Sequence, residues 1–228
     1  MESKNVCQEI FNPTGPFSVQ QMEKEIKDRL SKIQKEFASG FEFLQKYPKS
    51  VSFFGSSLFK EDNEHYQKAR RLAEQFAKLK YTIITGAGGG IMEAANRGAF
   101  EAGGKSVGLN IQLAEKQSLN KYLTDSMEFC YFFSRKTILS FAAEAYLFFP
   151  GGFGTLDEFF EILELLHTKK IFQTPLILVG SDYWNKLDDF IREEVFKKHR
   201  AIDEQDMKIY QIVDDEEAII KLVTGQKK

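Results

Sequence analysis

Ala-Tyr-Leu-Phe-Phe-Pro-Gly-Gly-Phe-Gly-Thr-Leu-Asp-Glu-Phe-Phe-Glu-Ile, residues 145–162, decides the fold of this chain. Residues 145–149 form an apolar run typical of a buried strand, and residues 155–168 have the composition of an apolar helix. The glycine-rich turn between them leaves the first backbone N–H groups of the helix without intrahelical partners. Because those groups lie at the positive end of the helix dipole, the turn predicts an anion site, most often one for phosphate.

A second interpretation of the same turn needs no ligand. Thr155 to Glu158 fit the capping-box pattern, in which Thr155 caps the helix and Glu158 bonds back to the Thr155 backbone. This interpretation accounts for two residues, but it does not require three glycines. We therefore favour phosphate binding, with Glu158 and Glu161 as carboxylates within reach for acid–base chemistry.

The strand–turn–helix pattern recurs through most of the chain. Predicted strands cover residues 51–54, 82–85, 106–111, 128–133, 145–149, 175–179 and 208–213, and predicted helices cover residues 62–79, 91–102, 134–143, 155–168, 182–199 and 214–223. Strands that alternate with helices of this length indicate βαβ units and a parallel sheet. The expected fold class is α/β, a Rossmann-like doubly wound, mainly parallel sheet of about six or seven strands.

The N-terminal region does not share this pattern. Residues 1–16 are broken by proline and glycine and predict a loose arm. Apolar residues then recur at helical spacing from Ser18, a candidate N-cap, to about Tyr47. We divide the chain into an arm with an amphipathic helical extension, residues 1–47, and a Rossmann-like nucleotide-binding domain, residues 48–228.

Glycine-rich or hydroxyl-bearing loops follow several of the predicted strands. Besides the turn after residue 149, these are Gly55-Ser56-Ser57 and the segment from Gly86 to Gly90. In a parallel sheet all of them reach one edge, where ligands of such folds bind. The second loop lacks the last glycine of a dinucleotide fingerprint, since Ile91 stands there, so binding of NAD or FAD is not expected.

Arg135 and Lys136 begin a predicted helix directly after a strand. Positive side chains at a helix N-terminus oppose the helix dipole, so the placement is locally unfavourable. A local rule broken in this way is a hint of function, although a solvated surface pair is the alternative.

Composition excludes several classes of function. The 228 residues include 31 basic and 33 acidic side chains, so the net charge is −2 and lacks the basic excess of nucleic-acid or membrane-surface proteins. No apolar run resembles a signal peptide or a membrane span, which predicts a cytoplasmic protein. There is no P-loop, no serine-hydrolase elbow and no zinc-like spacing of cysteine or histidine, so neither a metal nor a cofactor is expected.

Several motifs together resemble one known family. Pro150 to Glu158 matches the Pro-Gly-Gly-x-Gly-Thr-x-x-Glu signature of the Lonely Guy (LOG) proteins, which are cytokinin riboside 5′-monophosphate phosphoribohydrolases often labelled "possible lysine decarboxylase". The pair Arg135-Lys136, the loop at residues 55–57 and the segment Gly88 to Asn96 match further family motifs. The resemblance covers about residues 50–200, and the N-terminal region is similar to the extension of longer bacterial members.

The resemblance implies a homodimeric enzyme that hydrolyses the N-glycosidic bond of adenosine-type 5′-monophosphates, giving free base and ribose 5-phosphate. It implies Arg135 and Glu158 as the catalytic pair. Glu161 lies one helical turn after Glu158 on the same face, so it is a candidate assisting carboxylate, with a structural role as the alternative. The implied phosphate- and nucleotide-binding residues are Gly55, Ser56, Gly88, Gly89, Gly90, Lys136, Gly151, Gly152, Gly154 and Thr155. Glu93 stands where family members often have glycine, so a base preference different from that of those members is an open alternative.

Two other functions stay open at this point. A non-catalytic nucleotide sensor would use the same loops without turnover, and an interaction module would act mainly through the N-terminal amphipathic helix. Lysine decarboxylation would need pyridoxal phosphate on a suitably placed lysine, and no lysine of the sequence has such a setting.

Overall fold

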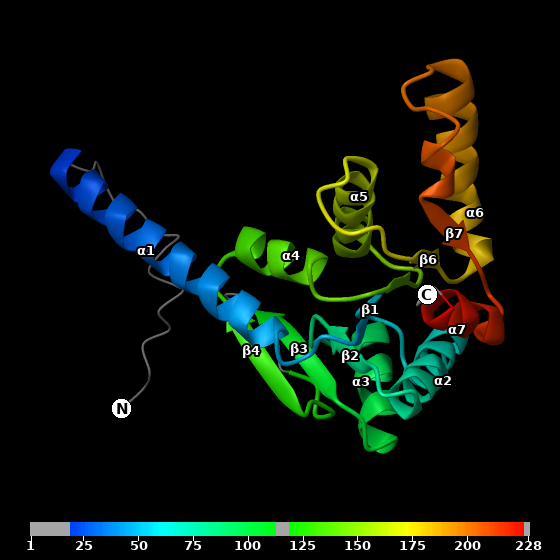
Figure 1. Cartoon of the computed structure of the whole chain (residues 1–228), viewed down its shortest axis with the longest axis horizontal. Helices are drawn as coiled ribbons and strands as arrows, with labels where there is room; N and C mark the ends of the chain where they lie inside the picture. Colours follow the sequence, from blue (N-terminus) through cyan, green and yellow to red (C-terminus); the bar gives the residue numbers. More distant parts are fainter. Residues whose placement is uncertain (1–18, 113–118, 226–228) are drawn as a thin grey trace.

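A computed structural model describes residues 19–112 and 119–225, so the predicted arm lies outside the described residues. Seven strands form one sheet in the order β4-β3-β2-β1-β5-β6-β7, and every neighbouring pair is parallel. The predicted Rossmann-like α/β fold is therefore confirmed (Figure 1). The strands are β1 (Ser50–Phe54), β2 (Thr82–Thr85), β3 (Ser106–Ile111), β4 (Asp125–Phe129), β5 (Tyr146–Phe148), β6 (Leu176–Leu178) and β7 (Tyr210–Ile212).

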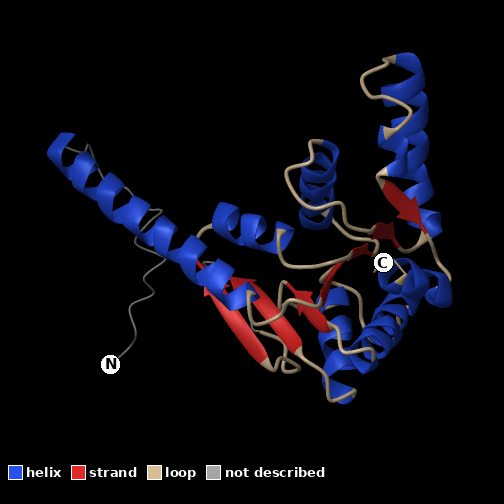
Figure 2. Ribbon diagram, in the orientation of Figure 1, coloured by secondary structure: helices blue, strands red, loops and turns tan. Residues whose placement is uncertain are grey.

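Helices cover both faces of the sheet. They are α1 (Val19–Leu44), α2 (Glu64–Lys78), α3 (Ile91–Glu101), α4 (Phe132–Ser140), α5 (Phe153–His167), α6 (Ser181–Phe190) and α7 (Glu216–Thr224), with a π-helical segment (Ile191–Lys198) after α6 and a short 3₁₀ turn (Asp206–Lys208) before β7. Figure 2 shows α2, α3 and α7 on one side of the strands and α1, α4, α5 and α6 on the other.

Strand residues alternate between two apolar cores. In β5, Tyr146 and Phe148 pack with α4, α5 and α6, whereas Leu147 points to the opposite core with α2, α3 and α7. In β1, Phe53 and Phe54 likewise face opposite cores. Side chains of a strand alternate in this way, and a parallel sheet covered on both faces is apolar on both.

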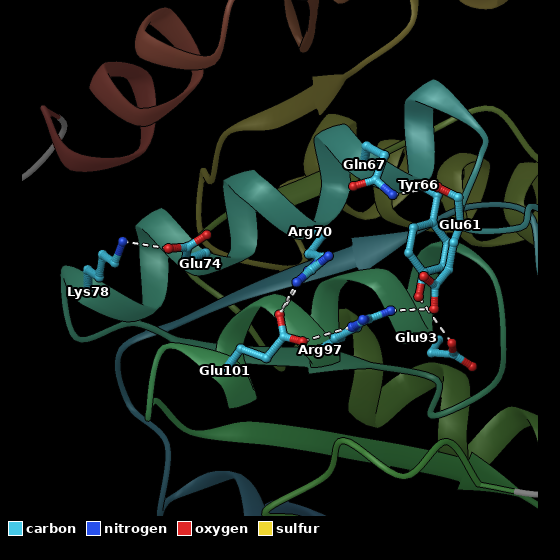
Figure 3. A network of polar contacts seen from close by, with 9 residues as sticks. All are labelled: Glu61, Tyr66, Gln67, Arg70, Glu74, Lys78, Glu93, Arg97 and Glu101. Carbon is cyan, nitrogen blue, oxygen red and sulfur yellow. Dashed lines mark hydrogen bonds and ion pairs between the residues drawn. The ribbon is translucent and has the colours of Figure 1, made fainter.

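A network of ion pairs joins α2 to α3 on the outer surface. Arg70 and Arg97 both contact Glu101, at 2.5 and 2.9 Å, and Arg97 also pairs with Glu61 (Figure 3). Tyr66 donates a hydrogen bond to Glu93 at 3.1 Å. These contacts hold the two helices, and with them the loops that precede α3, in one arrangement.

The structure corrects the sequence prediction at β4 and α4. The strand was predicted at 128–133 and the helix at 134–143, but β4 ends at Phe129 and α4 begins at Phe132. The apolar run that suggested a strand belongs partly to the turn and the helix. β4 is an edge strand whose residues alternate between partly buried and exposed up to the buried Phe129, because successive side chains of a strand point to opposite faces of the sheet.

The C-terminal part of α1 packs against the body. Phe43 and the following Tyr47 are buried in the core, and the helix contacts α4 and β4, while its other end extends away (Figure 1). The candidate N-cap Ser18 lies outside the described residues. No helix in the described part of the chain is both long and apolar enough to cross a membrane.

The order of the strands fixes where a ligand would bind. From β1 the chain builds the sheet outward through β2, β3 and β4, and it then returns to add β5 on the other side of β1. The chain therefore leaves β1 and β5 in opposite directions at the carboxyl edge of the sheet. In open α/β sheets the crevice at such a switch point is the usual ligand site.

Candidate active site

The loops after β1 and β5 are joined directly. The Ser56 backbone N–H donates to the Pro150 carbonyl at 3.0 Å, and the Tyr183 hydroxyl donates to the Gly151 carbonyl at 2.8 Å. A Cβ at Gly151 would lie 2.6 Å from the Thr155 Cβ and 3.0 Å from the Ser56 nitrogen. Only glycine allows the two loops to approach this closely.

The N-terminus of α5 is open. The helix begins at Phe153 with Gly152 as its N-cap, and no side chain caps it. The capping-box interpretation is therefore wrong, because Thr155 lies within the first turn and is buried there. Within the described residues the N–H groups of Phe153 and Gly154 form no hydrogen bond, and nothing lies within 4 Å of a Cβ placed at Gly152 or Gly154.

A cavity of about 330 Å³ opens beside this turn. It brings together residues from the loops after β1, β2 and β5 and from α3, α4 and α5. Seven of the predicted site residues line it: Gly55, Ser56, Arg135, Gly152, Gly154, Thr155 and Glu158. The predicted convergence of loops at one edge therefore produces a real cavity.

Arg135 is fixed in the wall of this cavity by backbone groups. Its Nε donates to the Leu109 carbonyl at 2.7 Å, and its guanidinium lies over Gly86, where any Cβ would collide with it. Burial lowers the pKa of Arg135, and the nearby charge of Glu158 opposes that shift. An arginine stays protonated under these conditions, so the cavity has a fixed positive charge.

Glu158 supplies a carboxylate that is almost out of reach of solvent. Its residue is 8% exposed, and its Oε2 has no hydrogen-bond partner within the described residues. Burial raises the pKa of Glu158 to about 7, with Arg135 lowering it and Glu161 raising it further. A buried carboxyl that titrates near neutral pH, next to a fixed cation, is a combination common at catalytic sites.

Lys136 and Glu161 lie outside the lining of the cavity. Lys136 forms ion pairs with Asp157 at 2.7 Å and with Glu161 at 2.8 Å, linking α4 to α5. These carboxylates raise the pKa of Lys136 against the opposing effect of its partial burial. The two neighbouring basic residues therefore differ: Arg135, predicted as catalytic, lines the cavity, whereas Lys136, predicted to bind phosphate or nucleotide, forms a bridge between two helices.

The predicted residues Gly88, Gly89 and Gly90 lie in the loop between β2 and α3, outside the lining of the cavity. Gly90 has a φ of +64°, and a Cβ there would collide with the backbone of Ser56 and Ser57. The next residue, Ile91, donates its N–H to the Ser56 carbonyl at 2.9 Å. Gly89 and Gly90 let the loop after β2 pack on the loop after β1, and none of the three glycines lines the cavity.

The apolar wall of the cavity was not predicted from the sequence. Six apolar side chains from four separate segments form it: Phe54, Leu58, Met92, Ile111, Phe132 and Leu139. Glu93, the predicted departure from the family pattern, accepts a hydrogen bond from Tyr66 and is not among the lining residues. The wall residue of that segment is its neighbour Met92, which a helical projection from the glycine loop could have indicated.

These features define a Rossmann-like α/β protein with a buried carboxylate and a guanidinium at the switch point of its sheet. The chain belongs to the family described as "Possible lysine decarboxylase", the LOG family, whose profile matches residues 92–223, more than half of the chain. One relative, named cytokinin riboside 5′-monophosphate phosphoribohydrolase, from Rhodococcoides fascians, is 26% identical over 147 residues, which cover 63% of this chain and 74% of the relative. A protein of the same enzyme name from Arabidopsis thaliana is 27% identical over 146 residues, 63% of each chain.

Solved structures share the fold. A structural-genomics target matches with a TM-score of 0.59 and 23% identity, covering 78% of this chain and 99% of that one. A molybdenum cofactor binding protein from Rippkaea orientalis matches with a TM-score of 0.58 and 20% identity over 78% of this chain and 96% of its own. The molybdenum cofactor carrier protein of Chlamydomonas reinhardtii gives 0.58 and 18%, with 78% and 99% covered.

Proposed function

We propose that this protein hydrolyses the N-glycosidic bond of adenosine-type nucleoside 5′-monophosphates, either AMP or a cytokinin riboside monophosphate. The products are the free base and ribose 5-phosphate. The observation that carries the proposal is Glu158, a buried carboxyl with an unpartnered oxygen, in one cavity with Arg135 and an open helix N-terminus. The names of the relatives from Rhodococcoides fascians and Arabidopsis thaliana support the same activity.

The free N–H groups of Phe153 and Gly154 suit the 5′-phosphate, because they lie at the positive end of α5. Binding the phosphate there converts binding energy from a non-reacting part of the substrate into positioning of the ribose. The six-residue apolar wall offers a surface for the base.

Cleavage of an N-glycoside develops positive charge on the ribose ring, as other glycosidic cleavages do. The Glu158 carboxylate would stabilise that charge or take a proton from the attacking water, and a pKa of about 7 keeps both protonation states populated at neutral pH. Arg135 would donate to the departing base or orient Glu158. Its tie to the Leu109 carbonyl holds the guanidinium in place for either role.

The test is chromatography of free adenine released from AMP by the purified full-length protein and by its Glu158→Gln variant. We expect the variant to lose at least about 10²-fold in rate, the low end of the contribution of a positioned acid or base, while still binding AMP. Glu42→Gln, an exposed change on α1, serves as the charge-matched control with unchanged turnover. Unchanged turnover in Glu158→Gln would contradict the site assignment.

A non-catalytic nucleotide-binding protein is the second candidate. Solved structures with this fold include molybdenum cofactor carriers, which shows that the architecture also occurs in proteins named for binding. Both candidates use the open turn at Gly152 and Gly154. A melting temperature raised by AMP without release of base from any nucleotide in a panel would favour binding alone.

We also propose that the protein is a homodimer with the cavity near its interface. Phe153 is 93% exposed at the start of α5, Phe160 is 44% exposed about two turns further along α5, and Phe132, which lines the cavity, is also exposed. A cluster of exposed aromatic side chains around a site is more apolar than an isolated monomer usually presents. Contact with a second copy would bury these rings.

A further inference from the structure

A second cavity lies at the opposite edge of the sheet. Its volume is about 590 Å³, larger than that of the candidate active site, and it opens where β1, β2 and β3 begin. Its basic lining residues are Lys46, Lys49, Lys78, Lys80 and Lys105. No carboxylate side chain lines it in the described part of the chain, although the whole chain has a net charge of −2.

The register of the sheet brings these lysines together. Lys49 directly precedes β1, and Lys105 directly precedes β3. The N–H of Thr82 donates to the Lys49 carbonyl at 2.8 Å, and the N–H of Ile83 donates to the Lys105 carbonyl at 3.0 Å. The backbones of these two lysines therefore flank the start of β2, and Lys80 lies two residues before that strand. Their convergence is a property of the fold.

Lys80 occupies a backbone position that favours glycine. It ends α2 with a φ of +67°, and its N–H donates to the Ala77 carbonyl at 2.9 Å. Gly103 ends α3 with the same φ and the equivalent bond to the Phe100 carbonyl at 3.0 Å. Because glycine adopts this conformation at little cost, a lysine here places an ammonium group on the cavity despite an unfavourable backbone.

Most of these charges have no carboxylate partner. Lys78 pairs with Glu74 at 2.5 Å (Figure 3), but no ion pair joins Lys46, Lys49, Lys80 or Lys105 to a carboxylate within the described residues. Lys49 instead donates to the Leu79 carbonyl at 2.7 Å, which satisfies the end of α2. Four ammonium groups around one cavity repel one another, and a multivalent anion would relieve that repulsion.

Aromatic rings form firm walls behind two of the lysines. Lys49 lies 4.2 Å from the centre of the Tyr81 ring, and Lys105 lies 5.4 Å from that of Tyr47. Both tyrosines are buried, and the Tyr47 hydroxyl is held by Asp125 at 2.5 Å. The buried rings offer no face for stacking, so recognition here depends on charge.

We propose that this cavity is a second anion site, which binds a small, multiply phosphorylated molecule. A single phosphate would neutralise only part of the positive charge. Two or three linked phosphoryl groups carry enough negative charge to match the four ammonium groups that have no carboxylate partner within the described residues. The five residues of β1 span roughly 17 Å, so a ligand here is distinct from one at the glycine turn. The proposal is independent of the reaction proposed above.

Calorimetric titration of the full-length protein with inorganic tripolyphosphate tests the site. The variant is Lys80→Gly with Lys105→Gln, since glycine suits the backbone at residue 80 and the fold should persist, as a melting curve would verify. The control is Lys197→Gln with Lys198→Gln, which removes the same charge from the exposed π-helical segment. We expect binding at least about tenfold weaker in the variant and unchanged in the control.

Two results would overturn the proposal. Equal weakening in the variant and the control would mean that only overall charge matters. Binding that survives in the Lys80 and Lys105 variant but is lost in Arg135→Gln would place the anion at the glycine turn. Failure of AMP hydrolysis would leave the tripolyphosphate result unaffected, so the two proposals fail separately.

Discussion

Glu158→Gln should change how the stability of the protein depends on pH. Burial raises the pKa of Glu158 to about 7, against an ordinary value of 4.5. Between these values the native state holds a proton that the unfolded chain releases. The free energy of unfolding therefore falls as the pH rises through this window, because the folded pKa is the higher one.

The size of the effect follows from the two pKa values. A shift from 4.5 to about 7 corresponds to about 3 kcal/mol at 1.36 kcal/mol per pKa unit. Between pH 5 and pH 8 the Glu158 carboxyl should cost the native protein about 2.5 kcal/mol, since part of the titration lies below pH 5. Glutamine keeps the shape of the side chain without ionising, so the variant should lose this component.

This pH-dependent difference in stability can be measured by urea unfolding of the native protein and the Glu158→Gln variant at pH 5 and pH 8, at one protomer concentration. We expect the variant to gain about 2.5 kcal/mol relative to the native protein on going from pH 5 to pH 8. Glu42→Gln controls for the loss of an exposed charge. A difference between native protein and Glu158→Gln that stays constant within about 0.5 kcal/mol would refute the buried, proton-binding state of this carboxyl.

Two further predictions concern the glycine turn and the interface. Gly151→Ala should lower the free energy of unfolding by about 1–3 kcal/mol in urea titrations, because its Cβ would overlap with Thr155, whereas Gly154→Ala faces open space and should leave stability nearly unchanged; equal losses would contradict the packing argument. Phe160→Asp should convert a dimer to a monomer in size-exclusion chromatography with light scattering, since it places a charge among the exposed rings of α5; a native protein that is already monomeric would sink the proposed interface.

The sequence predicted most of the fold because its signals are local. Strand-length apolar runs, helical spacing and glycine turns each depend on a few neighbouring residues, and their alternation leaves few topologies. The error at β4 has the same origin. The polar first part of this edge strand, residues 125–127, was not predicted as a strand, and the predicted strand at residues 128–133 extended into the apolar start of α4.

The site was predictable where it depends on the backbone and unpredictable where it depends on packing between elements. Arg135, Glu158 and the glycine turn all follow strands, so the parallel sheet places them at one edge, which the sequence could predict. The ion pairs of Lys136 depend on how α4 crosses α5, and the apolar wall combines side chains from four segments. No spacing along the chain encodes either arrangement.

The ionisation of Glu158 depends on what the neighbouring cations are bound to. Arg135 gives its Nε to the Leu109 carbonyl, and Lys136 is engaged by Asp157 and Glu161, so neither forms an ion pair with Glu158 among the described residues. Had either cation bound Glu158 directly, its pKa would fall below the ordinary value, and the carboxyl would be a permanent anion. Because burial remains the largest influence on the pKa of Glu158, that pKa is raised to about 7. The ion pairs that remove Lys136 from the cavity thus help to keep Glu158 able to exchange a proton.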